Sequence, residues 1–453
     1  MSVVRRLPVV ADLTLVTAGA MTANIAGYLL QLLASRWLGV TGYSPFASLL
    51  AVQLLCAVPA LALQNVVARE IVRGAPIAAA RGLALRCAGL VAILALVLVP
   101  VVSAVLNVGL AASAAALCAA PVLVLLSGEQ GVLQGRSRFR ELAMVLGGAG
   151  IARVTPALIV LAAGGGTAAA LWAAAAGIAI AAAAARRAAD TTSARGDSRA
   201  AGTVSEPPLD STSADLTGTV GGVQPDPRSA DEKSTPTLSA EAAANVSVLP
   251  VFRAAQVQAA LMALSSADLL VSRIVLSEDE AGRYALGAIA AKIAFWLPQA
   301  VGVVLYPKMA QPQHSARAMR SALAVLVGVG ALGVLGAAVA APLAPLFADQ
   351  DYAPVQGYLW LFALQGALLA VLQGALLSAI AADRTAPAAI TWIGLAVGVT
   401  VMLTCAHSVL SLITIATATA AVTTLVISTI ALRTARPGTT PDSPVPGLGP
   451  NGT

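Results

Sequence analysis

The chain has 453 residues, of which 58% are hydrophobic and 11% are charged, and its mean hydropathy is +0.84. So small a polar fraction cannot cover the surface of a water-soluble globule, which predicts a membrane protein. The formal net charge of +6 is explained by basic loops between membrane spans, so we expect no nucleic-acid partner.

Twelve apolar stretches follow one another along the chain. Each is roughly 20 residues long and can therefore cross the ~30 Å hydrocarbon core of a bilayer as a helix. They predict an all-α polytopic membrane protein with about twelve transmembrane helices. The stretches are residues 9–34, 44–67, 87–107, 112–135, 142–163, 165–185, 248–275, 284–306, 320–345, 356–380, 386–406 and 409–432.

The composition changes to Ser, Thr, Asp, Glu, Pro and Gly between the sixth and seventh stretches, as in PPLDSTSADLTGT. This segment has too little apolar surface to offset the entropy of ordering, so we expect a disordered cytoplasmic linker at residues 187–245. The Pro- and Gly-rich end, residues 434–453, is expected to be a disordered cytoplasmic tail. The predicted organisation is thus one six-helix lobe at residues 1–186 and a second at residues 246–433.

The two predicted lobes echo each other in sequence. LLASR at Leu32–Arg36 returns as LLVSR at Leu269–Arg273, offset by 237 residues. VLQG at Val132–Gly135 returns unchanged at Val371–Gly374, offset by 239 residues. The shared order and the nearly constant offset indicate an internal repeat. Many secondary transporters build a substrate site between two such repeated bundles.

Lys and Arg are concentrated in alternate loops. With the N-terminus in the cytoplasm, 21 of the 27 lie in cytoplasmic segments, which is the bias that orients membrane proteins. Both termini are therefore expected in the cytoplasm. Of the other six, Arg36, Arg273 and Arg283 lie on the outside. Arg153, Arg253 and Lys292 lie within spans.

Catalytic and metal-binding motifs are missing from the sequence. It lacks the GxxxxGK[ST] phosphate-binding loop. Its two histidines, His314 in a cytoplasmic loop and His407 at an outer helix end, cannot form a zinc site or a histidine-based triad. The four cysteines lie in or beside spans without a disulfide or metal spacing. We therefore expect neither an enzyme nor a resident cofactor or metal.

Ionisable residues inside spans are candidates for function, because each costs roughly 2.5 to 3.5 kcal/mol on insertion scales unless it faces a partner or a water-filled cavity. Asp268 and Lys292 lie at similar depth on the seventh and eighth spans, so we expect an ion pair with a gating or coupling role. Glu129 and Arg153, on the fourth and fifth spans, are expected to pair in the same way. Arg253 shares a polar face of the seventh span with Asp268.

Neutral polar residues form rows on two predicted helices. Asn24 and Gln31 are seven residues apart on the first span and share a face with Thr17, and Gln299 is seven residues from Lys292 on the eighth. Such residues either line a substrate cavity or hydrogen-bond between packed helices, for roughly 0.6 kcal/mol each. Both alternatives remain open for Asn24, Gln31 and Gln299.

Three segments carry recognisable motifs, SRWLGVTGYSPFASLLAVQLLCAVPALALQNVVARE, LSGEQGVLQGRSRF and SSADLLVSRIVLSEDEAGRYALGAIAAKIAFWLPQAVGVVLYPKMA. In them an Arg and a Leu-Gly precede a Gly-Tyr, an Asp lies in the outer half of the seventh span, and an Ala-Gly pair and a Tyr open the eighth. These residues are Arg36, Leu38, Gly39, Gly42, Tyr43, Asp268, Ala281, Gly282 and Tyr284. The pattern resembles the polysaccharide and lipid-linked oligosaccharide flippases of the multidrug/oligosaccharidyl-lipid/polysaccharide (MOP) superfamily.

The resemblance implies two six-helix lobes around a central cavity that opens alternately to each side of a bacterial cytoplasmic membrane. The implied substrate is a polyprenyl-pyrophosphate-linked oligosaccharide or polysaccharide precursor, moved with an ion gradient or the membrane potential. Cationic cavity residues suit its pyrophosphate. The candidate substrate-binding residues are Arg36, Asn24, Gln31, Arg153, Arg253, Arg273 and Gln299, and the gating or coupling candidates are Asp268, Lys292 and Glu129.

Three alternative functions remain open. A multidrug/cation antiporter of the same superfamily would use acidic residues such as Glu129 and Asp268. A major facilitator transporter ranks lower, because REIVRGAPIAAARG between the second and third spans lacks the acidic-basic signature of that family. A non-transporting membrane scaffold would recruit glycan-assembly enzymes through the linker. Deletion of about residues 190–244 would abolish a scaffold's function and leave a flippase largely active.

Overall fold

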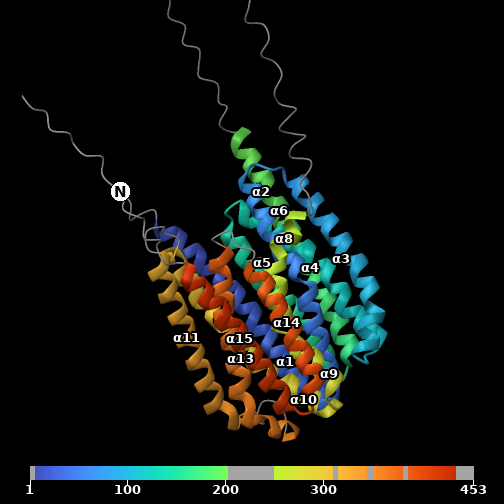
Figure 1. The fold of residues 1–453 in the computed structure, drawn as a ribbon. Helices are drawn as coiled ribbons and strands as arrows, with labels where there is room; N and C mark the ends of the chain where they lie inside the picture. Colours follow the sequence, from blue (N-terminus) through green and yellow to red (C-terminus); the bar gives the residue numbers. More distant parts are fainter. Residues whose placement is uncertain (1–5, 202–248, 310–314, 344–349, 381–385, 435–453) are drawn as a thin grey trace, which may run out of the picture. The chain divides into compact units, whose positions relative to one another are not determined.

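A computed structural model of the chain describes residues 6–201, 249–309, 315–343, 350–380 and 386–434 (Figure 1). These residues are almost entirely helical and include no β-strand. The expectation of an all-α polytopic membrane fold is confirmed. The predicted C-terminal tail lies outside the described residues apart from Thr434, and so does the predicted linker beyond Ala201.

The first half of the chain is a series of helices joined by short turns. α1 spans Arg6–Cys56, but Gly39 within it has φ 67° and ψ −179°. Essentially only glycine adopts this backbone conformation, so α1 consists of two helices joined at a sharp break. After it come α2 (Val58–Val72), α3 (Ile77–Val105), α4 (Leu110–Gly135), α5 (Phe139–Ala162) and α6 (Thr167–Ala201).

The second half begins with a bent pair, α8 (Leu249–Leu264) and α9 (Ala267–Val275), whose axes differ by 41°. The predicted single span at residues 248–275 is therefore not straight. The remaining elements are α10 (Glu278–Met309), α11 (Ser315–Ala340), the short 3-10 helices η2 (Ala341–Leu343) and η3 (Gln350–Tyr358), α13 (Leu359–Ile380), α14 (Ala386–Cys405) and α15 (Val409–Thr434).

The described helices account for twelve membrane spans. Nine stretches of the described residues are long and apolar enough to cross a membrane, or ten if α8 and α9 form one bent span. The first of the nine, Thr14–Val72, has 59 residues and would be about 90 Å long if straight, roughly three times the hydrocarbon thickness. The break at Gly39 divides it into two spans. This division and the bent pair α8 and α9 bring the total to eleven, and α10, with 32 residues at the position of the predicted eighth span, makes twelve.

The start of the third span differs from its prediction. The expected span is residues 87–107, whereas α3 begins at Ile77. Its N-cap is Pro76, whose fixed φ suits the position just before a helix. Arg81 and Arg86 therefore lie on the helix rather than in the preceding loop, which places Arg81 within reach of the neighbouring spans.

By their contacts, the described residues form two compact units. Unit 1 contains residues up to Leu30 and Leu49–Gln258, and unit 2 contains Gln31–Ser48 and the residues from Ala259 onwards. α4 contacts α2, α3 and α6 in unit 1, and α13 contacts α10, α11 and α15 in unit 2. Both α4 and α13 carry the repeated VLQG. The repeated tetrapeptide thus lies in the helix that has neighbours on several sides in each unit.

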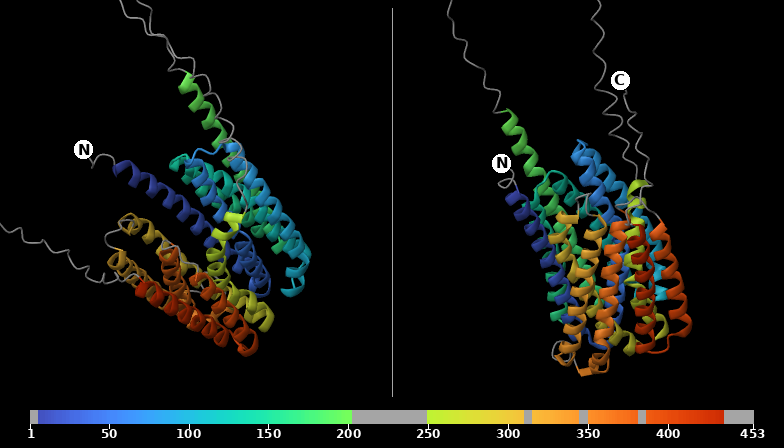
Figure 2. Two further views of the ribbon diagram at one scale, coloured as in Figure 1. Left: turned by 45° about the horizontal axis from the view of Figure 1, so that its top comes forward. Right: turned by 60° about the vertical axis from the view of Figure 1, so that its left-hand side comes forward.

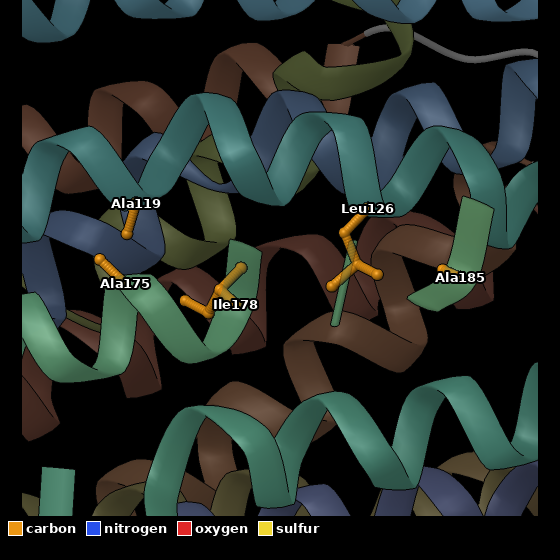
Figure 3. Close-up of a cluster of buried hydrophobic side chains, with 5 residues drawn as sticks. All are labelled: Ala119, Leu126, Ala175, Ile178 and Ala185. Atoms are coloured by element: carbon orange, nitrogen blue, oxygen red, sulfur yellow. The ribbon is translucent and has the colours of Figure 1, made fainter. Parts of the chain in front are cut away.

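Small side chains allow the helices of unit 1 to pack closely. α3 to α6, drawn from light blue to green, lie side by side in both views of Figure 2. Between α4 and α6 the contact is made by a cluster of mostly small side chains (Figure 3), namely Ala119, Leu126, Ala175, Ile178 and Ala185. Lipid supplies no hydrophobic driving force between helices, so close van der Waals contact of this kind stabilises the bundle.

Candidate functional site

The span formed by α8 and α9 is interrupted just before Asp268. The hydroxyl of Ser265 donates a 2.9 Å hydrogen bond to the carbonyl of Met262, a local bond of the kind that competes with the helix ladder. α9 restarts after Ser266, and Asp268 lies in its first turn. There the carboxylate is favoured by the unpaired N–H groups and by the positive end of the helix dipole.

Asp268 is the centre of a buried cluster formed with Tyr284 and Gln365, called here the Asp268 cluster. The hydroxyl of Tyr284, on α10, donates to Oδ2 of Asp268 at 2.7 Å. Nε2 of Gln365, on α13, donates to the same oxygen at 3.0 Å. The three residues are 3%, 0% and 2% exposed. One carboxylate oxygen thus joins α9, α10 and α13.

Lys292, the expected partner of Asp268, interacts with it through its charge. Tyr284 and Gln365 donate hydrogen bonds to Oδ2 of the carboxylate. Lys292 is half-buried on α10, eight residues or about two turns beyond Tyr284. The gating or coupling role of Asp268 and Lys292 stays a prediction.

Two acceptor atoms at or near the Asp268 cluster are buried without a hydrogen-bond partner among the described residues. They are Oε1 of Gln365 and Oγ of Ser266. Buried polar atoms are normally paired, so both are open to a water molecule or to a ligand with a proton or positive charge. No group of three His, Cys, Asp or Glu residues suited to a metal occurs in the part of the chain that the structure describes.

The corner between the first two spans, residues Gln31–Ser48, belongs to unit 2. The hydroxyl of Tyr352, on η3, donates to the backbone carbonyl of Ser35 at 3.2 Å. Nη1 of Arg273, on α9, donates to the hydroxyl of Ser44 at 3.3 Å. Both serines are fully buried. These bonds join the first repeat of the LL-x-SR pattern to the second half of the chain.

The Ala-Gly pair of the sequence motif explains how closely this corner packs. A Cβ on Gly282 would overlap the backbone carbonyl of Val40, so only glycine permits the observed contact. Of the predicted site residues in the corner, Arg36 is exposed and Gln31 is half-buried. Arg273 is half-buried and also interacts with the charge of Glu278.

The expected ion pair of Glu129 with Arg153 is wrong. Glu129 instead accepts two hydrogen bonds from Arg81 on α3, at 2.8 Å from Nε and 3.0 Å from Nη2. Nη2 of Arg81 also lies 2.7 Å from Oδ1 of Asp190 on α6. This triad ties three helices of unit 1 together. It was missed because Arg81 was assigned to a loop.

Arg153 has a neutral partner. Its Nη2 donates to Oε1 of Gln53, on α1, at 3.0 Å, and Gln53 is 3% exposed. Nε of Arg153 is buried and has no hydrogen-bond partner among the described residues. No carboxylate of a described residue forms an ion pair with Arg153.

Asn24 lies on a helix that packs against the helix of this arginine. A Cβ on Gly150 of α5 would meet the backbone and side chain of Ala23 on α1, at 2.5 and 2.6 Å. Asn24 follows Ala23 directly and Arg153 lies one turn beyond Gly150, so the two predicted site residues are on neighbouring turns of packed helices. The side chains of Arg253, on α8, and Gln299, on α10, lie outside the described part of the structure.

Several solved transporter structures share this fold. An inward-facing multidrug resistance MATE family transporter of the MOP superfamily matches with a TM-score of 0.62 and 12% identity, over 91% of this chain and 94% of that one. The eukaryotic MATE transporter AtDTX14 matches with a TM-score of 0.54 and 13% identity, over 95% and 99%. A mutant of the Vibrio cholerae MATE transporter VcmN matches with a TM-score of 0.54 and 14% identity, over 94% and 96%.

No protein-family model matches the sequence, and no curated protein sequence matches it. The structural likeness covers nearly the whole chain, which supports the assignment of twelve spans in two lobes. At 12% to 14% identity it establishes the fold.

Sequence reasoning missed three residues that contact the candidate side chains, namely Gln53, Arg81 and Gln365. Gln53 and Gln365 lie in long apolar runs, and an uncharged amide does not stand out there as an ionisable residue does. The available signal was the position of these amides near the middle of predicted spans, where a polar side chain needs a partner. For Gln365 that partner lies about one hundred residues earlier in the chain.

Proposed function

We propose that this chain is a membrane transporter that moves a polyprenyl-pyrophosphate-linked oligosaccharide or polysaccharide precursor across the bacterial cytoplasmic membrane by alternating access. The observation that carries the proposal is the Asp268 cluster, a buried carboxylate at the break of a discontinuous transmembrane helix. Interrupted helices of this kind hold substrate and coupling-ion sites in secondary transporters. The MATE-like fold supports the same class of function.

In this proposal the Asp268 cluster couples transport to an ion or to the membrane potential. The two donors to Oδ2 of Asp268, the hydroxyl of Tyr284 and the amide of Gln365, are neutral. Binding of a proton or cation to the carboxylate would weaken the two hydrogen bonds that hold α10 and α13 against α9. The charge of Asp268 would thereby control how three helices of unit 2 pack together. The positive charge of Lys292, on α10, would act on the same carboxylate.

The cationic residues of the chain support an anionic cargo. Arg36, Arg153 and Arg273 lie on three different helices. A guanidinium group can donate two parallel hydrogen bonds to the oxygens of one phosphate. The resemblance of the Arg36 to Tyr43 and Asp268 to Tyr284 motifs to polysaccharide flippases points to the same substrate class. Both termini are placed in the cytoplasm in this proposal, because the loops on that side carry most of the Lys and Arg.

The test is leaflet exchange of a fluorescent polyprenyl-pyrophosphate oligosaccharide in liposomes that contain the purified protein. Wild type is expected to exchange the lipid faster than empty liposomes, and Asp268→Asn and Lys292→Gln are each expected to exchange it at least tenfold more slowly. Asp279→Asn is the matched control, because Asp279 is an exposed acid at the start of α10. It makes the same chemical change as Asp268→Asn and is expected to leave the rate unchanged.

The same preparation distinguishes the competing functions. A cation/drug antiporter is favoured by the neutral donors to Oδ2 of Asp268, which leave the carboxylate able to accept a proton or a cation. It would show cation-driven dye efflux without lipid exchange, and Asp268→Asn would abolish the efflux. A scaffold would be silent in both assays and would lose its cellular function on deletion of residues 202–244. That deletion spares Asp190, which contacts Arg81.

A further inference from the structure

Two arginines of unit 1 are held between neighbouring helices in opposite ways. Arg81 contacts the carboxylates of Glu129 and Asp190, so its charge is balanced inside the protein. Arg153 contacts the uncharged amide of Gln53, and no carboxylate of a described residue balances it. Arg153 is therefore a cation whose counterion is not part of the described protein.

The position of Arg153 makes this imbalance costly. It lies nine residues before the last residue of α5, Ala162, which is about 14 Å along the helix. Its Nε is buried without a partner among the described residues. On the side of α6 the backbone approaches so closely that a Cβ on Gly177 would overlap the carbonyl of Ala152. An arginine at such a depth is retained where it meets an anion or a water-filled cavity.

The single hydrogen bond to Gln53 uses one of the five N–H groups of the guanidinium. It orients the planar group and leaves the remaining donors for a second, stronger partner. Phosphate oxygens fit such a group, because they accept two parallel hydrogen bonds and carry the missing negative charge. Gln53 is thus placed to act as a positioning residue and Arg153 as the anion receptor.

The other candidate arginines are in different surroundings. Arg273 contacts Ser44 and also interacts with the charge of Glu278. Arg36 is exposed, so water can solvate it. Among these three, Arg153 has the strongest requirement for an anion from outside the chain.

We infer that Arg153, oriented by Gln53, binds a phosphate group of the transported lipid from within unit 1. The identity of the lipid in this inference rests on the proposed function. The inference itself requires that the lipid binds to Arg153, and it does not require that the lipid is transported. It selects one of several candidate cations as the phosphate receptor. It also predicts that a carboxylate introduced beside Arg153 would compete with the phosphate of the lipid for the guanidinium group.

The experiment measures binding of a fluorescent polyprenyl pyrophosphate to the purified full chain in detergent by fluorescence anisotropy. Competition with polyprenol of the same length tests the need for phosphate, and competition with inorganic pyrophosphate distinguishes a free anion from a lipid-borne one. The variants are Arg153→Gln, Arg153→Lys and Gln53→Glu, which places a carboxylate beside Arg153. Arg86→Gln removes a charge from an exposed position on α3 and is the matched control.

We expect polyprenol to compete at least tenfold more weakly than unlabelled polyprenyl pyrophosphate. Arg153→Gln and Gln53→Glu are expected to bind the probe at least tenfold more weakly than wild type. The affinity of Arg153→Lys should lie between those of these two variants and wild type, and the affinity of Arg86→Gln should equal that of wild type. Neither Arg153→Gln nor Gln53→Glu should lower the thermal unfolding temperature, because each relieves an unbalanced charge that is partly buried. If inorganic pyrophosphate competes as well as the lipid, the site binds free anions and the inference of a lipid phosphate is wrong.

Two results separate this inference from the proposed function. Wild-type binding that Arg153→Gln and Gln53→Glu weaken, in a protein that exchanges no lipid between leaflets, would uphold the anion site and reject the flippase. Normal lipid exchange and normal probe binding in both variants would uphold the flippase and reject Arg153 as the receptor. If Arg153→Gln does not fold, Gln53→Glu retains the arginine and decides the question.

Discussion

The hydroxyl of Tyr284 lies 2.7 Å from Oδ2 of Asp268, and the two residues are on consecutive helices. The ring of Tyr284 also packs edge-on against Phe362 on α13, with centroids 5.0 Å apart. α13 is the helix that supplies Gln365, the second donor to the same oxygen. The tyrosine therefore contributes both a hydrogen bond and an aromatic contact to the junction of three helices.

Tyr284→Phe separates these two contributions, because it keeps the ring and removes the donor. A hydrogen bond to a charged group is worth about 1.5 to 3 kcal/mol, so we expect a loss of that size in the free energy of unfolding. The measurement is chemical unfolding of the purified protein in detergent. Tyr43→Phe is the control, because the Tyr43 hydroxyl is equally buried but has no hydrogen-bond partner among the described residues. Equal effects of the two substitutions would contradict the assigned role of the Tyr284 hydroxyl.

The number and order of the spans could be predicted because they depend on long apolar runs that the bilayer requires. The Gly39 break and the Ser265–Ser266 bend depend on individual backbone conformations, which hydropathy does not encode. In the sequence, the break at Gly39 is marked only by a glycine between the first two apolar stretches. Both changes leave the apolar pattern on either side intact.

The candidate pairs were harder to predict than the spans. Glu129 was assigned to Arg153 because the two lie on consecutive spans, yet Arg81 on α3 is its partner. Sequence can place a charge at a depth in the membrane, but the direction of a side chain around its helix axis depends on packing. A shift of one residue in a helix turns a side chain by about 100°, so depth alone does not identify a partner.

Gly366→Ala tests whether close packing of α13 on α10 positions the Asp268 cluster. A Cβ at this position would overlap the backbone carbonyl of Ala291, so the two helices would have to separate next to Gln365. We expect a loss of about 1 to 3 kcal/mol in the free energy of unfolding, the usual result of overpacking. Lipid exchange should also slow, because Gln365 would move away from Asp268.

The control for this substitution is Gly328→Ala on α11, where the added methyl would meet open space. It is expected to stabilise the helix by up to about 1 kcal/mol, the difference in helix propensity between glycine and alanine. If Gly366→Ala behaves like Gly328→Ala in unfolding and exchange, the close contact does not position Gln365.

Arg81→Gln and Glu129→Gln are expected to differ although they remove opposite halves of one ion pair. Without Arg81, the carboxylate of Glu129, whose side chain is 10% exposed, is left without its partner. Removing one member of a buried pair costs about 3 to 5 kcal/mol, and we expect about 2 to 3 kcal/mol here because Arg81 is partly exposed. Without the charge of Glu129, Arg81 keeps Asp190, so the loss should be about 1 kcal/mol.

The double variant Arg81→Gln with Glu129→Gln completes a thermodynamic cycle in chemical unfolding. It should be more stable than Arg81→Gln alone, because the unpaired carboxylate is gone. Additive losses from the two single substitutions would show that the residues do not interact, since contacting residues give non-additive effects. Lipid exchange should follow stability in all three variants, because the triad joins helices of unit 1 and is not proposed to touch the cargo.

Gly39→Ala tests the break that divides the first long helix into two spans. At φ 67° and ψ −179° an alanine is strained by about 1 to 3 kcal/mol, although its methyl would meet open space. The strain would be relieved if the break opened, and the corner that contacts Tyr352 and Gly282 would then shift. We therefore expect both lower stability in chemical unfolding and slower lipid exchange. Gly27→Ala, in a helical and equally open position of α1, should change neither, and a loss of similar size there would show that the backbone angle of Gly39 is not the cause.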